Sequence, residues 1–338
     1  MTSIRENGLT VDSLTAMAGA AGGPKWLVLA ALDKLLFSDW LTARDKPLPL
    51  VGSSIGSWRF AAAAQANSVA AINTLEHLYI EQQFSDRPDI AEVTAMGRHI
   101  LGELLGDTGA QAILDHQWAR LHIITCHCQG RTSSDHPLRL GAGFAEAFLA
   151  NSLSRRYLAR YLHRHVFADQ RYHFEHAAFP GFHNQLLALT ADSLPEALLA
   201  SGSIPFVLEQ IAINNKQGYR DGGLIDYHMD LPLAAEGVVL MPHFSHRCVT
   251  GWLDKHLRWR KPTAMDHHLV IHPSDAWIAS LPNGKIPDRQ DFNRYRGDYQ
   301  GRLNVWRNVV KRSEELADCF ASRLARNDWL AHIEPLRP

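Results

Sequence analysis

The segment PLPLVGSSIGSWRFAAAAQA, residues 47–66, decides the fold of this chain. The apolar run from Leu48 to Val51 is typical of a buried strand, and the alanine-rich sequence from Trp58 to Ala71 is typical of a helix. Between them, Gly52-Ser53-Ser54-Ile55-Gly56 fits the pattern G-x-S-x-G. We therefore predict a sharp strand-to-helix turn with Ser54 at its tip.

A serine held on such a turn has the properties of a nucleophile. The turn strains the backbone of the serine, so the positions two residues away, Gly52 and Gly56, must lack bulk. The hydroxyl of Ser54 then projects from the carboxyl edge of the sheet, near the positive end of the next helix. The pattern alone is weak, because about one chain of this length in ten contains it by chance. A plain polar turn is the alternative.

The composition is that of an ordinary globular protein. Hydrophobic residues make up 46% of the 338 positions and charged residues 20%, which supports a sizeable core. Lys and Arg (34) nearly balance Asp and Glu (35), so no bulk charge attracts nucleic acid. No nucleic-acid partner is therefore expected.

The N-terminus, the apolar runs and the cysteines indicate the compartment. No basic segment leads into an apolar stretch at the N-terminus, and no apolar run is long enough to span a bilayer. Four scattered cysteines do not form a disulfide framework, which favours a reducing compartment. We expect a cytoplasmic protein, with peripheral contact to a membrane left open.

Strand and helix patterns alternate along the chain. Further strands are predicted over residues 8–18, 121–128, 211–213, 217–221, 238–242 and 268–272. Helices are predicted over residues 24–41, 72–118, 141–165, 194–202 and 299–331, with irregular sequence from 165 to about 185. This alternation predicts a single α/β domain over residues 1–338, with a mostly parallel sheet covered on both faces.

Two further motifs complete a candidate catalytic site. The small-residue loop from Ala18 to Gly23 runs into a helix N-terminus, where unpaired backbone N–H groups can hold an oxyanion. Asp221 stands at a predicted strand end, and the glycines after it let a reacting group approach the carboxylate. Tight turns are the alternative for both motifs. The loop could also hold a phosphate, although it lacks the P-loop spacing.

Together these motifs resemble the patatin-like family of lipid acyl hydrolases. The glycine-rich loop of that family is similar to residues 21–26, its elbow to 52–56 and its Asp-Gly-Gly motif to 221–223. A proline-containing segment of small residues, 200–205, also resembles the family. The resemblance runs from about residue 15 to about 232 and covers residues 233–338 less clearly.

The resemblance implies a fold and a mechanism. The family fold is a three-layer α/β/α sandwich, and its members use a Ser–Asp dyad without histidine. By position, Ser54 would be the nucleophile and Asp221 the base, with Gly22 and Gly23 in the oxyanion hole. The expected reaction is hydrolysis of carboxylic esters, above all lipid acyl esters, through an acyl-enzyme and without metal or organic cofactor. The expected partner is thus a lipid or small ester substrate.

Three positions depart from the family pattern. Ala21 replaces the first glycine of the loop, which requires a negative φ at that residue, and Trp26 replaces the last. Tyr227 stands where the family usually has an asparagine, and Pro232 comes late. These departures indicate a distant branch, so neither headgroup nor chain length carries over.

Two other functions stay open. One is an α/β-hydrolase-type esterase with a Ser-Asp-His triad, although only about 50 residues precede Ser54, too few for the strands which that fold places before its elbow. The other is a non-catalytic acyl-binding pseudo-hydrolase. The candidate triad histidines are His228, His243, His246, His267, His268 and His272.

Three remaining features favour structural roles. His122, Cys126 and Cys128 share one face of a predicted strand, but no second ligand pair completes a zinc pattern nearby. Residues 252–261 interleave Trp with Arg and Lys; a lipid anchor is one interpretation, and a solvated helix with its Trp in the core is favoured. The C-terminal helix over 299–331 is expected either to cover the core or to serve as an oligomer element.

Overall fold

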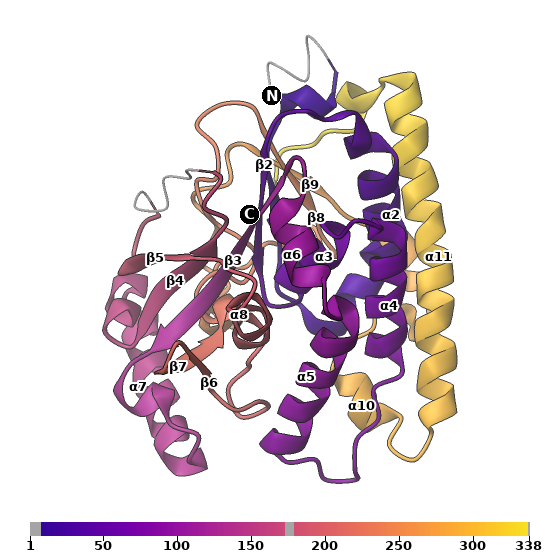
Figure 1. The fold of residues 1–338 in the computed structure, drawn as a ribbon. Coiled ribbons are helices and arrows are strands. Elements are labelled where there is room, and N and C mark those ends of the chain that lie inside the picture. The colour runs from indigo at the N-terminus through magenta and orange to yellow at the C-terminus, as the bar shows by residue number, and fades with distance from the viewer. Residues whose placement is uncertain (1–7, 173–178, 337–338) are drawn as a thin grey trace.

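The computed structural model describes residues 8–172 and 179–336, and its centre is a nine-stranded sheet (Figure 1). The strands are β1 (Leu14–Gly19), β2 (Leu48–Ser53), β3 (Ala119–Cys128), β4 (Leu162–Ala168), β5 (Asn184–Ala188), β6 (Ile211–Ile213), β7 (Lys216–Asp221), β8 (Val238–Pro242) and β9 (His268–Ile271). Seven follow the order β5-β4-β3-β2-β1-β8-β9, while β7 pairs with β3 and β6. Five of the eight pairings described are parallel, so the prediction of a mostly parallel sheet is confirmed.

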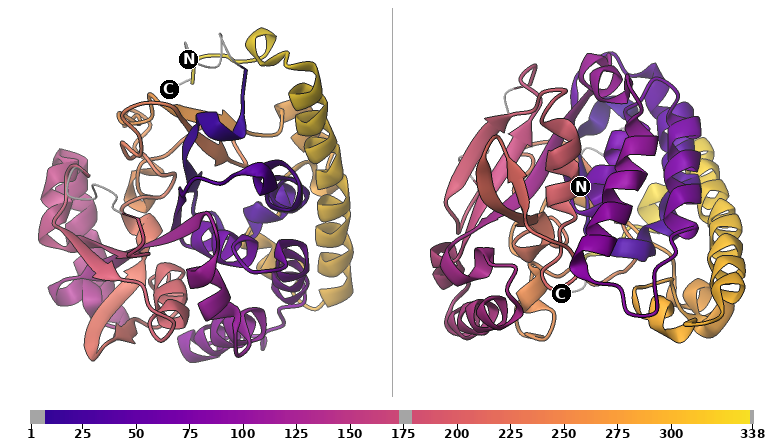
Figure 2. Two further views of the ribbon diagram at one scale, coloured as in Figure 1. Left: turned by 45° about the horizontal axis from the view of Figure 1, so that its top comes forward. Right: turned by 60° about the horizontal axis from the view of Figure 1, so that its bottom comes forward.

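Helices cover both faces of the sheet. They are α2 (Ala30–Ser38), α3 (Ile55–Ala63), α4 (Ser68–Ile80), α5 (Ile90–Leu105), α6 (Gly109–Asp115), α7 (Pro137–Leu153), α8 (Leu194–Ser201), α9 (Asp275–Ala279), α10 (Gln290–Arg294) and α11 (Tyr299–Arg326). The layer that contains α2, α4 and α11 lies on one side of the sheet, and α7 lies beyond the other side (Figures 1 and 2). The fold is the expected three-layer α/β/α sandwich.

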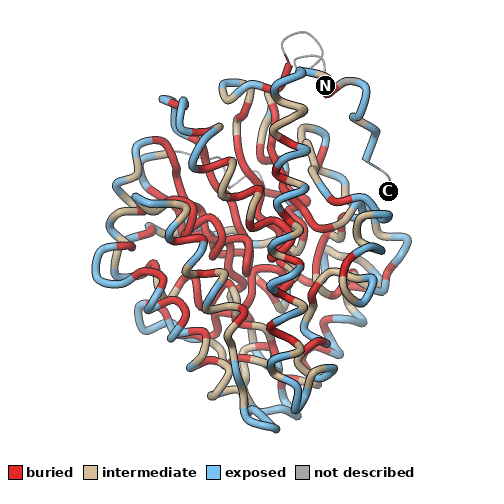
Figure 3. The backbone as a smooth tube through the Cα atoms, turned by 90° about the vertical axis from the view of Figure 1, so that its right-hand side faces the viewer, coloured by how far each residue is buried: buried red, intermediate tan, exposed pale blue. Residues whose placement is uncertain are grey.

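The core follows from the alternation of side chains along the strands. Successive residues of a strand point to opposite faces. Leu50 and Ile123 therefore join the larger apolar cluster beneath α2, α3 and α4, whereas Val51 and Ile124 join a second cluster on the opposite face. Buried backbone runs through the middle of the molecule, with exposed segments around it (Figure 3).

The C-terminal helix α11 covers the core, as predicted. Trp306 is fully buried, and its indole stacks on Tyr79 with ring centroids 6.5 Å apart. The indole Nε1 also donates to Asp291 Oδ2 at 3.0 Å. The helix ends at Arg326, because Asn327 adopts the left-handed conformation, and residues Trp329–Ala331 form a separate 3-10 turn.

Several element boundaries differ from the prediction. The expected helix over 58–71 is two helices, α3 and α4, and Asn67 begins the second by accepting a hydrogen bond from Ala70 N–H. The expected strand over 8–18 begins only at Leu14. The basic stretch 252–261 contains the short 3-10 turn η8 (Trp252–Asp254) rather than an α-helix, and Trp259 is 68% exposed.

Strands β4 and β5 were not predicted from the sequence. Residues 162–165 fall in an expected helix and residues 166–168 and 184–185 in an expected irregular stretch, of which 173–178 lie outside the described residues. Arg164 explains the error in part: it is buried in β4, where its Nε donates to Asp226 Oδ2 at 2.6 Å. Because the charged Arg164 occupies a buried position of β4, the strand lacks the apolar pattern by which strands are recognised in a sequence.

Two features are absent from the described residues. No helix described here is both long and apolar enough to cross a membrane. No group of three His, Cys, Asp or Glu residues in the described ranges is arranged to hold a metal ion.

Candidate active site

The strand β2 and the helix α3 meet at Ser54. This residue has φ 55° and ψ −130°, a conformation that costs free energy for any residue with a side chain. Gly56 makes the turn sterically possible, because a Cβ atom there would lie 2.1 Å from the carbonyl oxygen of Gly19. The structure therefore has the strained strand-to-helix turn that the G-x-S-x-G pattern predicts.

A network of buried serines fixes this turn. The amide of Ser54 donates to Ser201 Oγ at 2.8 Å, and that hydroxyl donates in turn to the carbonyl of Ile124 at 2.7 Å. Ser57 Oγ lies 2.8 Å from the same Ser201 Oγ. Ser201 is therefore a positioning residue that the sequence analysis did not single out. Its signal was the small-residue segment 200–205 at the end of α8.

Asp221 contacts the hydroxyl of Ser54 directly. Ser54 Oγ donates to Asp221 Oδ2 at 2.8 Å, and the amide of Gly223 donates to the other carboxylate oxygen, Oδ1, at 2.7 Å. Both residues are nearly inaccessible to solvent. The structure thus brings together two residues that are 167 positions apart in the sequence.

Strand β3 explains why these residues meet. Its residue Ile124 pairs with Ser53 at the end of β2, and the next residue, Thr125, pairs with Asp221 at the end of β7. Because β2 is parallel to β3 and β7 is antiparallel to it, the two strands run toward each other and their ends meet.

The environment of Asp221 makes it a stronger base. Burial raises the pKa of the Asp221 carboxyl above its usual value, while the charge of Arg289 and the hydrogen bond from Ser54 act in the opposite direction. A carboxylate with a raised pKa accepts a proton from a hydroxyl more readily than an exposed one does.

The glycine loop lies against the same two residues. Ala21 does not have a positive φ, which fits the requirement for replacing a glycine, and its amide donates to the carbonyl of Tyr227 at 2.9 Å. That N–H is therefore already used. Gly23 has φ 57°, which favours glycine, and it begins the 3-10 helix η2 (Gly23–Leu29). Gly22 and Ala21 line a small cavity together with Ser54 and Asp221.

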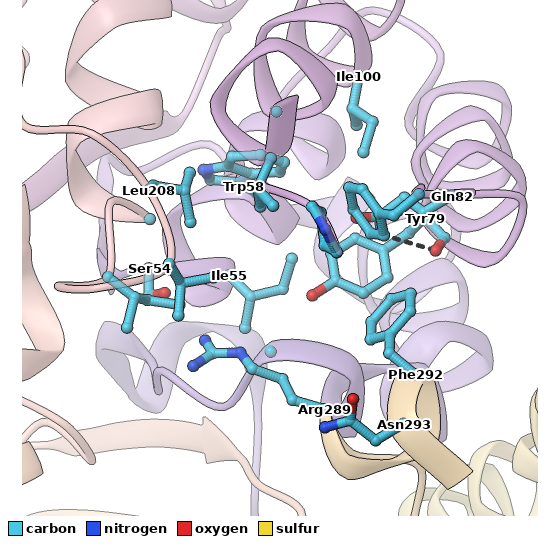
Figure 4. A pocket seen from close by; sticks show the side chains of 18 residues that line it. Ser54, Ile55, Trp58, Tyr79, Gln82, Ile100, Leu208, Arg289, Phe292 and Asn293 are labelled. Carbon is cyan, nitrogen blue, oxygen red and sulfur yellow. Dashed lines mark hydrogen bonds between the residues drawn. The ribbon is translucent and has the colours of Figure 1, made fainter. Parts of the chain in front are cut away.

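A larger apolar pocket of about 330 Å³ opens beside Ser54 (Figure 4). Its walls come from α3, α4, α5 and α10, and from the segment that follows α8. The polar side chains that line it with Ser54 are few: Tyr79, Gln82, Arg289 and Asn293. The apolar residues that line it are Ile55, Trp58, Phe84, Pro88, Val93, Ile100, Ile204, Val207, Leu208 and Phe292.

The candidate triad histidines lie in other environments. His228 accepts a hydrogen bond from the amide of Val249 at 3.0 Å, and His243 Nδ1 lies 2.6 Å from the carbonyl of Ser245. Burial lowers the pKa of His243 to about 3. The hydrogen bonds and ion pairs described for His246, His267 and His272 likewise involve neither Ser54 nor Asp221. In the described chain, the side-chain partner of the Ser54 hydroxyl is a carboxylate.

The His-Cys cluster on β3 is buried. His122 and Cys126 are fully inaccessible, and Cys128 is nearly so. Burial raises the pKa of the Cys126 thiol well above its ordinary value, which disfavours the thiolate that metals bind.

Comparison with known proteins agrees with this geometry. A family model described as "Patatin-like phospholipase" matches residues 20–229, which is more than half of the chain. The matched region contains Gly22, Gly23, Ser54 and Asp221. The search of curated proteins gave no match.

Proposed function

The chain belongs to the patatin-like phospholipase family, and from this premise we propose that it is a serine hydrolase acting on carboxylic esters, above all acyl esters of lipids. Ser54 is the nucleophile and Asp221 the base. The observation that carries this assignment is the 2.8 Å hydrogen bond from Ser54 Oγ to Asp221 Oδ2.

The reaction begins with attack of Ser54 Oγ on the ester carbonyl carbon while Asp221 accepts the hydroxyl proton. The carbonyl oxygen becomes an oxyanion, for which the amides of Gly22 and Gly23 are the donors. Collapse of the tetrahedral intermediate expels the alcohol, which takes the proton from Asp221, and leaves an acyl-enzyme. Water then attacks the acyl group, again with Asp221 as base, and releases the acid.

The apolar pocket is the site for the acyl chain. Ser54 lies at its edge, and aromatic and branched side chains such as Trp58, Ile100 and Phe292 form its walls. An acyl chain that leaves water for this pocket contributes about 0.8 kcal/mol per buried CH₂ group. Activity should therefore rise with chain length until the pocket is full.

Esterase assays with p-nitrophenyl esters of graded chain length test the proposal. Ser54→Ala and Asp221→Asn should each lower kcat/KM by at least about 10⁴-fold. Ser53→Ala is the matched control, because the Ser53 hydroxyl is buried without a hydrogen-bond partner among the described residues. Its activity should stay near that of the wild type.

Two outcomes would contradict the dyad. If a single histidine variant, for example His228→Ala or His243→Ala, loses activity as completely as Ser54→Ala, the enzyme uses a triad. If neither esters nor a fluorophosphonate probe react at Ser54 in the folded protein, the chain is an acyl-binding pseudo-hydrolase.

The cellular setting is part of the same proposal. All four cysteines are free thiols, which fits a cytoplasmic protein. We propose that residues 1–338 form one domain that meets its lipid substrate by peripheral contact with a membrane.

A further inference from the structure

Arg289 brings a positive charge to the nucleophile from outside the region that the family model matches. It precedes α10, and its side chain lines both cavities that contain Ser54. Figure 4 shows its guanidinium on the Ser54 side of the larger pocket. A Cβ atom on Gly23 would lie 3.1 Å from Arg289 Nε, so the guanidinium packs against the glycine loop.

In the described parts of the chain, the guanidinium of Arg289 forms no ion pair or hydrogen bond with an acidic side chain, although its charge acts on Asp221. The neighbouring carboxylate, Asp288, pairs with Lys285 at 3.0 Å. Asp221 is already bonded to Ser54 and Gly223. Arg289 is also accessible to solvent, so a ligand can reach it.

Lys255 adds a second cation to the same region. Its Nζ lies 4.0 Å from the ring centroid of Tyr227, which lines the small cavity with Asp221. Burial, followed by the charges of Arg289 and Lys25, lowers the pKa of Lys255 to about 8. Two cations, Arg289 and Lys255, thus act on the single carboxylate of Asp221, and a negative ligand would balance the excess positive charge.

We propose that Arg289, assisted by Lys255, forms an anion subsite beside Ser54 for a phosphate or carboxylate carried by the alcohol part of the ester. A guanidinium binds either group through two parallel N–H···O hydrogen bonds. Arg289 lines the apolar pocket beside Ser54 and is exposed to solvent, so an acyl chain in the pocket and an anionic alcohol at the guanidinium can be bound together. This inference rests on the proposed function and specifies its substrate class.

A matched pair of soluble substrates tests the subsite. Dibutyrylglycerol 3-phosphate carries the anion, and dibutyrylglycerol lacks it. Arg289→Gln should lower the ratio of kcat/KM for the anionic ester over the neutral one at least tenfold, chiefly through KM, and Arg289→Lys should restore part of it. The control is Arg294→Gln, an exposed arginine of α10 that does not line either cavity, which should keep the wild-type ratio.

The outcomes separate the subsite from the proposed function. If Arg289→Gln lowers kcat/KM for both substrates equally and shifts the acid limb of the pH profile, Arg289 acts only on Asp221. That result would refute the subsite. If the wild type cleaves neither ester, the hydrolase proposal fails, but calorimetric binding of glycerol 3-phosphate that Arg289→Gln abolishes still supports the subsite; no such binding refutes it. Hydrolysis of long-chain phosphatidate in vesicles would identify a lipid headgroup as the anion. Hydrolysis of the soluble ester alone would identify a free anionic ester.

A separate observation concerns the outer surface of α7. Five of the nine exposed large hydrophobic residues described in the chain lie between residues 138 and 157. Leu138 and Leu153 are 80% and 81% exposed, and Leu149 is 65% exposed. We define the α7 face as Leu138, Phe148, Leu149, Leu153 and Tyr157.

Basic residues border the α7 face. Arg139, Arg156 and Arg160 are exposed beside it, and Arg160 lies 5.6 Å from the ring centroid of Tyr157. The acidic residue of α7, Glu146, is paired with Arg131. Exposed leucines and aromatics with a basic border are typical of a helix that lies in the headgroup region of an anionic membrane.

The α7 face also lies near the catalytic site. On the buried side of α7, Phe144 contacts Trp252 and Phe206, with ring centroids 6.3 and 6.0 Å apart. Trp252 lines the small cavity with Ser54, and Phe206 is 47% exposed. Figure 1 shows α7 and the ends of β6 and β7 at the same end of the molecule. We infer that the α7 face docks on an anionic lipid surface.

Vesicle sedimentation tests this docking surface. Wild-type protein should bind vesicles with about 30% phosphatidylserine better than pure phosphatidylcholine. The double variant Leu149→Gln/Leu153→Gln should lose at least tenfold in this binding, while Trp259→Gln, an exposed tryptophan elsewhere, should not. Equal binding of the double variant would refute the inference. A concentration-dependent dimer that the double variant abolishes would also refute it, by assigning the face to a second copy of the chain.

Discussion

At the scale of single residues, two hydrogen bonds hold Ser54 in a strained conformation. Its backbone has a strained φ of 55°, its amide donates to Ser201 Oγ, and its hydroxyl donates to Asp221. Strain of this kind persists only where the surrounding structure determines the conformation. The two hydrogen bonds supply that determination and leave Ser54 Oγ at the edge of the apolar pocket.

The pKa of Asp221 predicts the acid limb of the pH profile. A base must be deprotonated to act, so kcat/KM should rise with pH through the pKa of Asp221 and level off above it. Because burial raises this pKa, the limb should lie above the ordinary range of an aspartate. Stopped assays with a neutral ester between pH 4 and about 9 measure it. A flat profile down to pH 4 would show that Asp221 is not the base.

Ser201→Ala should impair catalysis more than substrate binding. The variant leaves the amide of Ser54 without its buried acceptor, which costs about 1–3 kcal/mol and loosens the turn. We expect kcat to fall about tenfold or more while KM changes little. Ser203→Ala, which also removes a buried hydrogen bond two residues away, is the control. If both variants lower kcat alike, the effect is general destabilisation rather than positioning.

At the scale of elements, the site depends on three strands and one close contact. β3 aligns the ends of β2 and β7, and the start of α3 packs against the end of β1. The contact of Gly56 with Gly19 is between two backbones, so neither side can move without shifting a strand or a helix.

Glycine substitutions test this contact. Gly56→Ala places a methyl group 2.1 Å from the Gly19 carbonyl and should abolish activity, with a large loss of soluble folded protein. Gly102→Ala, inside α5, meets no atom within 4 Å and should stabilise the fold by about 0.5–1 kcal/mol. Thermal unfolding measures the stability of both variants, and esterase assays measure their activity. An active Gly56→Ala enzyme would show that the turn tolerates a side chain.

The features that could be predicted from the sequence are those whose signal lies within one short stretch of the chain. The G-x-S-x-G turn, the Asp221 motif and strands such as β8 each have their signal within about ten residues. Ser201 and Arg289 have no such signal, because their roles arise only when distant segments pack together. Strand β4 was missed for a related reason: the partner of its buried Arg164 is Asp226, far along the chain.

At the scale of the whole molecule, the C-terminal third completes the site. The family match ends at residue 229, yet Arg289 and Phe292 line the pocket, and Trp306 of α11 packs beneath it. The ring centroid of Trp306 lies 5.4 Å from that of Phe292 and 6.5 Å from that of Tyr79, and both of these residues are pocket walls. A helix outside the matched region therefore supports the pocket.

This packing predicts that the chain unfolds as one unit. Trp306→Ala removes a fully buried indole and should cost about 3–5 kcal/mol of stability, whereas Trp259→Ala, at a position 68% exposed, should stay within about 0.5 kcal/mol of the wild type. Loss of helical circular dichroism and loss of fluorophosphonate labelling at Ser54 should occur at the same denaturant concentration, and Trp306→Ala should shift both transitions together. The single-domain proposal requires this coincidence, because α11 contacts α2 and the pocket walls rather than a separate core. Two transitions, of which Trp306→Ala lowers only one, would instead show that the C-terminal third folds independently of the catalytic site.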